Sequence, residues 1–246
     1  MRAVYCAAHV PLDSEIVIWL QPEEIEALRL SLSVASRSVL LSLPLALLLA
    51  WVLTRKRFYG RTLLDAFVHL PLVLPPVVVG YILLLLFGNR GPLGAWLHQS
   101  LGVQLVFTRN GAALATAVMS FPLMVRAMRI SLENVDRGLE EAARTLGAAP
   151  LDRFASITLP LMLPGILAGA ITAFSAALGE FGAVITFVSN IPGETRTLPL
   201  ALYTALQVPG GDAAAARLAA ISFALGLSGL LISEWFARRV RTRLGH

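Results

Sequence analysis

Residues 66–89 read AFVHLPLVLPPVVVGYILLLLFGN, and this stretch contains no Asp, Glu, Lys or Arg. A bilayer core about 30 Å thick needs about 20 mostly apolar residues in a helix, so the stretch is long enough to cross a membrane. A transmembrane strand is a poor alternative, because its side chains would alternate in polarity, whereas residues 82–87 are apolar without interruption. We therefore predict a membrane-spanning helix that Pro71, Pro75 and Pro76 kink rather than end.

The same pattern recurs along the 246-residue chain and sets its class. Hydrophobic residues make up 57% of the sequence and charged residues only 14%, with a mean hydropathy of +0.73. Soluble domains carry roughly a quarter charged residues, so an ordinary soluble enzyme and a disordered chain are both excluded. We predict an all-α integral membrane protein with about five transmembrane helices, at 28–53, 63–87, 109–129, 160–189 and 213–236. Three more prolines are expected to kink these helices: Pro44, Pro122 and Pro164.

The positive charges are distributed unevenly between the two sides of this predicted bundle. Of the 20 Lys and Arg residues, thirteen follow the first span, lie between the third and fourth, or follow the fifth. Cytoplasmic loops carry an excess of Lys and Arg, so we expect the N-terminus outside and the C-terminus in the cytoplasm. The predicted parts are an external lead (1–27), a transmembrane domain (28–239) and a cytoplasmic tail (240–246). This asymmetry accounts for the net charge of +5 without a nucleic-acid partner.

The cytoplasmic loop 130–159 is predicted to form two short helices. Asp136 is placed to accept a backbone N–H at the start of the first helix. Gly147 suits the end of that helix, and Pro150 suits the first position of the next.

The first of these helices has one apolar face, with residues spaced i, i+3, i+4 and i+7: Leu139, Ala142, Ala143 and Leu146. On its polar side Glu140 and Arg144 are four residues apart, where an ion pair contributes about 0.2–0.5 kcal/mol. Periodicity alone leaves two interpretations open: the apolar face docks on another protein, or it lies on the lipid surface.

The stretch EAARTLGAAPLDRFASITLP, Glu141–Pro160, resembles the EAA signature of the permease subunits of ABC importers. The matching residues are Glu141, Ala142, Ala143, Gly147, Ile157, Leu159 and Pro160. The resemblance implies a type I ABC importer permease fold in a bacterial inner membrane, with the loop acting as a coupling helix. It also implies partners: ATPase subunits that use ATP and Mg²⁺, a periplasmic binding protein, and a second copy of the chain. The resemblance thus favours a protein partner for the apolar face.

Four further stretches of sequence narrow the resemblance to one group of permeases. HLPLVLPPVVVGY (69–81), VMSFPLMVRA (118–127), LGEFGAVITFVSNIPGETRTLPLALYT (178–204) and ISEWFAR (232–238) resemble bacterial molybdate permeases. The likeness extends from residue 28 to 239 and implies a periplasmic molybdate-binding protein as partner. Sulfate and thiosulfate permeases are similar, and tungstate has nearly the size and charge of molybdate, so these substrates remain alternatives. A passive anion channel would leave the internal loop without a role.

The chain is not expected to perform catalysis itself. It contains no G-x-x-x-x-G-K-[ST] phosphate loop, and its one lysine, Lys56, is followed by Arg57. It has no H-E-x-x-H motif, its four histidines are dispersed, and Cys6 is its single cysteine. These absences weigh against a membrane enzyme and predict no catalytic residue, metal or cofactor held by this chain.

A tetrahedral dianion crossing a low-dielectric core needs polar groups in place of its water. The hydroxyl candidates for lining a path are Ser120, Ser175, Thr186 and Ser189, although such side chains often bond their own helix backbone. Glu180 would repel an anion, so with Phe181 and Gly182 it is interpreted as part of a gate or as a structural hydrogen-bonding group. Arg37 reaches either the outer headgroups or an anion site.

Several further local features carry predictions. Short helices are expected at 92–101, with Trp96 at the interface, and at 198–207. Gly165 and Gly169 form a G-x-x-x-G face suited to tight packing. Asp65 and His69 are spaced to form a local pair. The predicted external loop 190–212 is expected to contact a binding protein. The contact residues are Gly193, Glu194, Thr195, Arg196 and Thr197.

Overall fold

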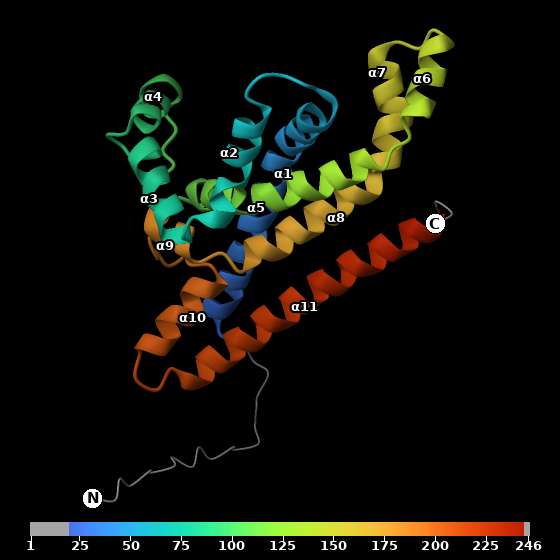
Figure 1. The fold of residues 1–246 in the computed structure, drawn as a ribbon. Helices are drawn as coiled ribbons and strands as arrows, with labels where there is room; N and C mark the ends of the chain where they lie inside the picture. Colours follow the sequence, from blue (N-terminus) through green and yellow to red (C-terminus); the bar gives the residue numbers. More distant parts are fainter. Residues whose placement is uncertain (1–19, 244–246) are drawn as a thin grey trace, which may run out of the picture.

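The computed structural model describes the backbone of residues 20–243 and the side chains of residues 20–235. Most of the predicted external lead, the last residues of the predicted tail, and Cys6 lie outside these ranges. The described chain is helical throughout (Figure 1). Its helices are α1 (Pro22–Arg55), α2 (Arg61–Val73), α3 (Pro76–Phe87), α4 (Pro92–Leu101), α5 (Arg109–Glu133), α6 (Arg137–Thr145), α7 (Pro150–Arg153), the π-helical turn η1 (Phe154–Thr158), α8 (Leu159–Leu178), α9 (Gly182–Val188), α10 (Leu198–Gln207) and α11 (Asp212–Arg243).

The number of membrane spans agrees with the prediction of about five. Four helical segments within the described residues are long and apolar enough to cross a membrane: Pro22–Arg55, Arg109–Glu133, Pro150–Leu178 and Asp212–Trp235. The bent pair Arg61–Val73 and Pro76–Phe87 makes a fifth if it counts as one span. In Figure 1, α5 and α8 run side by side, α11 runs along α8 below them, and α1 crosses both.

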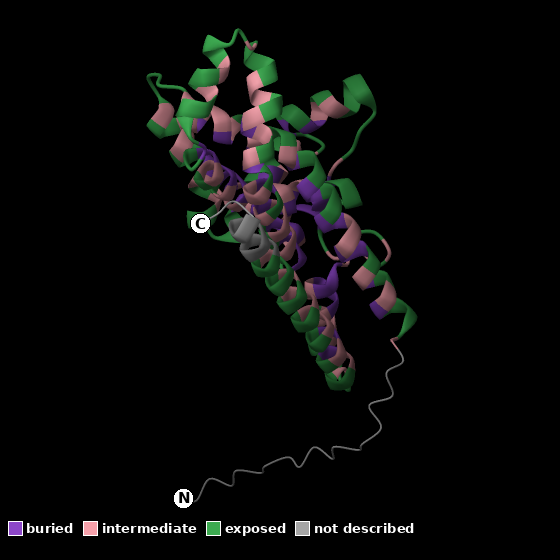
Figure 2. Cartoon of the chain, turned by 90° about the vertical axis from the view of Figure 1, so that its right-hand side faces the viewer, coloured by how far each residue is buried: buried purple, intermediate pink, exposed green. Residues whose placement is uncertain are grey.

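The packed centre lies where α1, α5 and α8 meet (Figure 2). Ala46, Ala50 and Met124 are fully buried there, so the backbones approach closely at small side chains. The outward side of α1 carries large apolar side chains that are mostly exposed: Leu40, Leu41, Leu45 and Leu48. Apolar side chains facing outward are stable in lipid, as expected for a membrane-spanning bundle.

The prediction for the prolines is confirmed at four positions and wrong at two. Pro44, Pro71, Pro122 and Pro164 lie inside helices. Pro75 and Pro76 instead end one helix and begin another, and the two halves are bent by 116°. The reason is steric: a residue before proline is pushed out of the α region. Leu74 and Pro75 both precede a proline, and their ψ angles of 143° and 135° are extended.

The predicted span 160–189 is likewise not one continuous helix. It ends at Leu178, and α9 begins at Gly182 after a short irregular segment. Glycine is unfavourable in a helix interior by about 1 kcal/mol relative to alanine, and two glycines flank Glu180 here. The helix therefore breaks completely at this segment.

The two breaks lie against each other, because α3 packs on α9. A Cβ atom built on Gly80 of α3 would lie 2.7 Å from the carbonyl oxygen of Ala183 and 2.8 Å from Cβ of Thr186. One built on Gly182 would lie 2.7 Å from Cβ of Pro76. The half-helices are thus in backbone contact, and glycine is required at both positions for steric reasons.

The predicted G-x-x-x-G face also packs tightly, and its partner is α5 of the same chain. A Cβ on Gly169 would lie 3.1 Å from Cβ of Ala127, and a Cβ on Gly165 would collide with the side chain of Ser131. Within the described chain, these glycines serve the α5–α8 contact.

We predict opposite effects for the same substitution at two helical glycines. Gly80→Ala places a methyl group against backbone atoms of α9, and overpacking of this kind costs roughly 1–3 kcal/mol. Gly226→Ala in α11 meets nothing within 4 Å, so the higher helix propensity of alanine is expected to leave stability equal or slightly raised. Melting temperatures of the purified variants test this, and equal melting temperatures would contradict the α3–α9 contact.

Candidate functional site

The segment α6–η1 projects from the end of the bundle (Figure 1). As predicted, Oδ1 of Asp136 accepts a hydrogen bond from the Gly138 N–H at 2.8 Å. Gly147 has a φ of +85°, which permits the turn out of α6, and Pro150 begins α7. No residue of α6 is buried. Leu146 is 88% exposed, so the apolar face has no partner among the described residues.

The signature residues divide between this projection and the bundle. Glu141, Ala142 and Gly147 are exposed, and Ala143 is half-buried. Ile157 in η1 and Leu159 at the start of α8 are half-buried, and Pro160 is exposed. The first half of the signature therefore forms an accessible helix, and the second half joins that helix to a membrane span.

Glu140 ties the projection to the bundle. Its Oε1 accepts a hydrogen bond from Nη2 of Arg55 at 2.9 Å and from Oγ1 of Thr158 at 2.7 Å. Glu140 thus bonds to the end of α1 and to η1, rather than to Arg144 as its spacing suggested. The Arg55 side chain is only 12% exposed. A charge-assisted bond in such a partly buried site contributes more than a pair on an open helix surface.

A second feature is the junction of the broken helices. Glu180 lies between α8 and α9, and its Oε1 accepts a hydrogen bond from the Ala183 N–H at 2.9 Å. The carboxylate thus caps α9. The Phe181 ring contacts that of Tyr203 in α10, with centroids 5.2 Å apart, and Gly182 packs on Pro76. These three residues fix the break against its neighbours.

The hydroxyl candidates are engaged with their own helices, which is the alternative left open by the sequence. Ser120 donates to the Thr116 carbonyl at 2.9 Å, Ser175 to Ile171 at 3.0 Å, and Thr186 to Gly182 at 2.8 Å. Ser120 is also buried, with Ser38 of α1 at 3.5 Å. Ser189 is exposed and has a φ of +64°.

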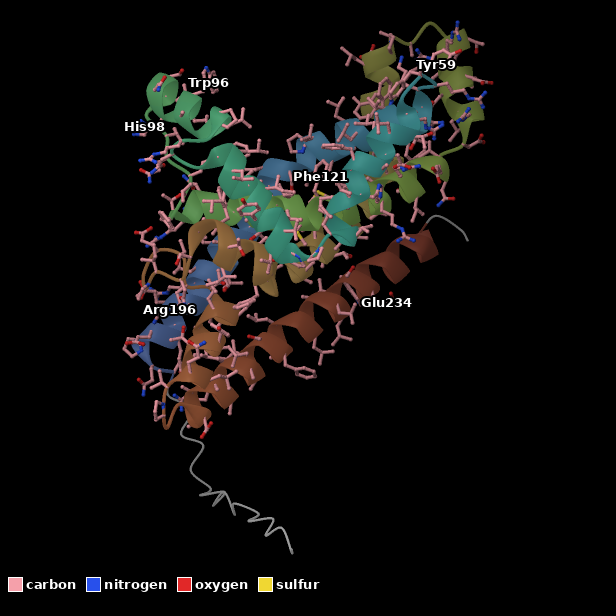
Figure 3. The ribbon with its side chains drawn as sticks, turned by 60° about the vertical axis from the view of Figure 1, so that its left-hand side comes forward. Tyr59, Trp96, His98, Phe121, Arg196 and Glu234 are labelled. Carbon is pink, nitrogen blue, oxygen red and sulfur yellow. The ribbon has the colours of Figure 1, made fainter. Side chains whose placement is uncertain are left out.

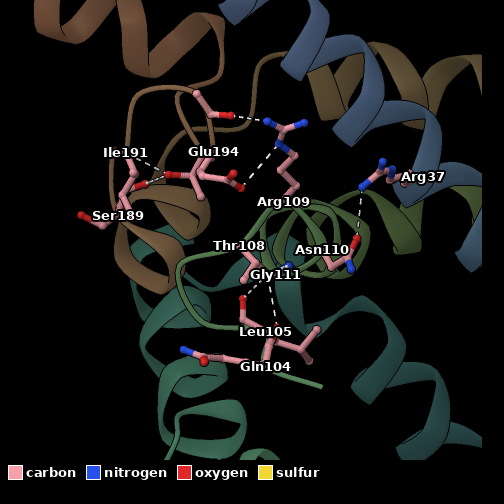
Figure 4. A network of polar contacts seen from close by, with 12 residues as sticks. Arg37, Gln104, Leu105, Thr108, Arg109, Asn110, Gly111, Ser189, Ile191 and Glu194 are labelled. Carbon is pink, nitrogen blue, oxygen red and sulfur yellow. Dashed lines mark hydrogen bonds and ion pairs between the residues drawn. The ribbon is translucent and has the colours of Figure 1, made fainter. Parts of the chain in front are cut away.

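The loop after α9 is held by its own hydrogen bonds (Figure 4). Thr195 is fully buried, donates to the Ser189 carbonyl and accepts from the Ile191 N–H, both at 2.9 Å. Thr197 is also buried. Of the five predicted contact residues, Glu194 is exposed, while Gly193 and Arg196 are half-buried. Arg196 lies near the N-terminal end of α1 (Figure 3).

Arg109 holds this loop to the start of α5. Its guanidinium donates to the Gly193 carbonyl and lies 3.5 Å from Glu194. Arg37 donates to Oδ1 of Asn110 at 3.1 Å, so its nearest partner is a neutral amide. Sequence reasoning missed Arg109 as a structural residue, because its partners lie 84 or more residues away.

At the other end of the bundle, the predicted Asp65–His69 pair is present at 3.3 Å. Arg129 of α5 also donates to Asp65, which spacing in α2 alone does not reveal. Near the N-terminal ends of α1 and α11, Nη2 of Arg217 donates a hydrogen bond to Oε1 of Glu24 at 2.7 Å.

Several apolar spans, two of them broken, describe a multi-pass α-helical membrane protein, and discontinuous membrane helices are common in transporters. The profile of the family described as "Binding-protein-dependent transport system inner membrane component" matches residues 42–242. The chain belongs to this family and is a multi-pass inner-membrane permease component.

Relatives agree along nearly the whole chain. The Molybdenum transport system permease protein ModB of Escherichia coli K12 is 58% identical over 226 residues, covering 92% of this chain and 99% of the relative. The Molybdenum transport system permease protein ModB of Haemophilus influenzae is 54% identical over 222 residues, covering 90% of this chain and 97% of the relative. The Sulfate transport system permease protein CysT of Escherichia coli K12 is 38% identical over 228 residues, covering 92% of this chain and 81% of the relative.

A solved structure agrees with the fold. A bacterial alginate ABC transporter, crystallised with its alginate-bound periplasmic protein, matches with a TM-score of 0.72 at 20% identity. The match covers 93% of this chain and 83% of the other. The two chains therefore share a fold.

We predict that Glu140 restrains α6. Glu140→Ala removes both bonds and leaves the Arg55 charge unpaired, a loss of about 1.5–3 kcal/mol. Amide hydrogen exchange across residues 137–145 is expected to accelerate by roughly tenfold or more, because 1.4 kcal/mol corresponds to a factor of ten. Arg144→Ala on the same helix is the matched control and should change the rate of hydrogen exchange little. Unchanged exchange in Glu140→Ala would contradict the tie.

We also predict that Glu180 stabilises α9 through its oxygen rather than its charge. Glu180→Leu removes the cap and should destabilise α9 by about 0.5–2 kcal/mol, whereas Glu180→Gln retains an acceptor. Hydrogen exchange across residues 182–188 is the measurement. If the two variants exchange equally fast, the side-chain oxygen is not the stabilising group.

Proposed function

We propose that this chain is the permease subunit of an ATP-driven importer for molybdate. The observation that carries the proposal is the difference in identity between relatives. The ModB permease of Escherichia coli is 58% identical over 226 residues, and its sulfate counterpart CysT is 38% identical over 228. The stretch 178–204, which resembles bacterial molybdate permeases, supports the same substrate. Tungstate and sulfate remain the competing ligands to be tested.

In this proposal α6 and the link after it dock into a separate cytoplasmic ATPase, which uses ATP and Mg²⁺. The contact residues are those of the EAA signature, of which Glu141, Ala142 and Gly147 are exposed. The Glu140 tie to Arg55 passes movement of α6 to α1, while Ile157, Leu159 and Pro160 connect it to α8. The open apolar face of α6 supports this assignment, since an apolar surface gains free energy when a partner covers it.

The path for the anion is proposed to form between two copies of the chain, lined by the broken helices. Glu180, Phe181 and Gly182 mark the gate region. The engaged hydroxyls of Ser120, Ser175 and Thr186 leave backbone groups near the breaks and Ser189 as the more available polar surface. Alternating access then follows from rigid-body rocking of the spans, driven by closure of the ATPase subunits.

The remaining assignments follow from orientation. With α6 in the cytoplasm, the N-terminus and the loop 189–197 face outside, where a periplasmic molybdate-binding protein docks. Glu194 and Arg196 offer the accessible side chains for that contact, on a backbone held by Thr195. The exposed leucines of α1 face lipid or the second copy. Residues 28–239 form the transmembrane domain.

The direct test is uptake of radiolabelled molybdate by proteoliposomes holding this chain with its ATPase and binding protein. Uptake is expected to require ATP, to fall with excess tungstate and to resist the same excess of sulfate, because sulfate is a smaller anion. Sulfate competition equal to that of tungstate would favour the sulfate alternative. Uptake by the chain alone, without ATP or ATPase, would establish a passive channel instead.

A further inference from the structure

We propose that an anionic phospholipid of the cytoplasmic leaflet binds in the pocket between α1 and the segment α6–η1, with its phosphate on Arg153 and an acyl chain along α1. The ligand is distinct from the transported anion. Only the choice of leaflet rests on the orientation proposed above.

The pocket has a volume of about 510 Å³ and two unlike walls. One wall is an apolar stretch of α1 that includes Pro44, Leu48 and Trp51. The opposite wall includes Phe154 of η1 and Arg153 at the end of α7. An apolar wall facing a guanidinium matches a ligand that is itself divided into a hydrocarbon part and an anionic part.

One cation of the pocket, Arg153, takes part in none of the ion pairs found among the described residues. The pocket's two charged lining residues are Glu140 and Arg153. Glu140 is paired with Arg55 at 2.9 Å. Nε of Arg153 is buried and has no hydrogen-bond partner within the described part of the chain. A buried unpaired donor is costly, and a guanidinium matches phosphate oxygens in geometry and charge. The unpaired guanidinium group of Arg153 therefore favours an anionic ligand.

The position of the pocket suits a membrane lipid rather than a free anion. Nζ of Lys56 lies 5.2 Å from the centroid of the Trp51 ring at the end of α1. Trp and Lys gather at the headgroup level. From Trp51 back to Pro44 the helix runs about 10 Å into the bilayer, at 1.5 Å per residue, which is enough to seat part of an acyl chain. A free phosphate would leave this apolar wall in water.

The same pocket adjoins the coupling segment. Glu140, which ties α6 to α1, lies in its wall, as does Thr158 of η1. A lipid seated there touches both sides of the tie and holds α1 and η1 together. Occupancy is therefore expected to slow the opening of α6 away from the bundle.

The test is native mass spectrometry of the importer complex, released from nanodiscs of mixed phosphatidylglycerol and phosphatidylcholine. The wild-type complex is expected to retain phosphatidylglycerol in preference to phosphatidylcholine. Arg153→Gln should reduce that retention about five- to tenfold, the effect of about one basic residue, while Arg153→Lys keeps most of it. Arg137→Gln, an exposed arginine of α6 outside the pocket, is the matched control and should retain the wild-type amount. Leu48→Trp should lower retention with Arg153 intact, because it fills the apolar wall.

Several outcomes would overturn the proposal. Equal retention by wild type and Arg153→Gln would show that the pocket does not select an anionic lipid. Loss of the partner subunits in Arg153→Gln, with phosphatidylglycerol retention unchanged, would show that a protein covers the pocket. Displacement of phosphatidylglycerol by inorganic phosphate would show that a free anion is the ligand. Molybdate uptake plays no part in this readout, so failure here is distinguishable from failure of the proposed function.

Discussion

The fold depends on satisfying backbone hydrogen bonds where two membrane helices break. A break leaves N–H and C=O groups without helical partners, and inside a bilayer such groups are tolerated only when protein or a water-filled cavity surrounds them. Here the break at Pro75–Pro76 and the break before Gly182 are packed together. The Glu180 carboxylate supplies an acceptor for the Ala183 N–H. Each break is tolerable because the other one covers it.

Features set by neighbouring residues could be predicted from the sequence, and features set by distant ones could not. Local chemistry accounts for the bounds of α4 and α10, for the Asp136 cap and for the turn at Gly147. The twin prolines were misjudged because a kink and a complete break have the same sequence signal. Arg55 with Glu140 and Arg129 with Asp65 join residues 85 and 64 positions apart. Only the packing of helices brings such pairs together.

The polar ties are concentrated at the two ends of the bundle. Glu24 with Arg217, and Arg109 with Gly193, hold the end where α1 and α11 begin. Arg55 with Glu140, and Arg129 with Asp65, hold the other. Between them the α5–α8 contact combines close approaches at Gly165 and Gly169 with large buried side chains such as Met128 and Met162, and several hydroxyls bond their own helices. Ends fixed by ion pairs and a well-packed apolar centre suit spans that move as rigid units.

The nine residues of α6 contribute no side chain to the protein interior. Apart from Glu140, changes in this helix therefore meet little resistance from the folding energy of the bundle. Such a helix is free to adapt its surface to a companion subunit while the membrane portion stays as it is. In the proposed importer, a change of ATPase partner would therefore require substitutions in this short exposed helix and none in the membrane-spanning core.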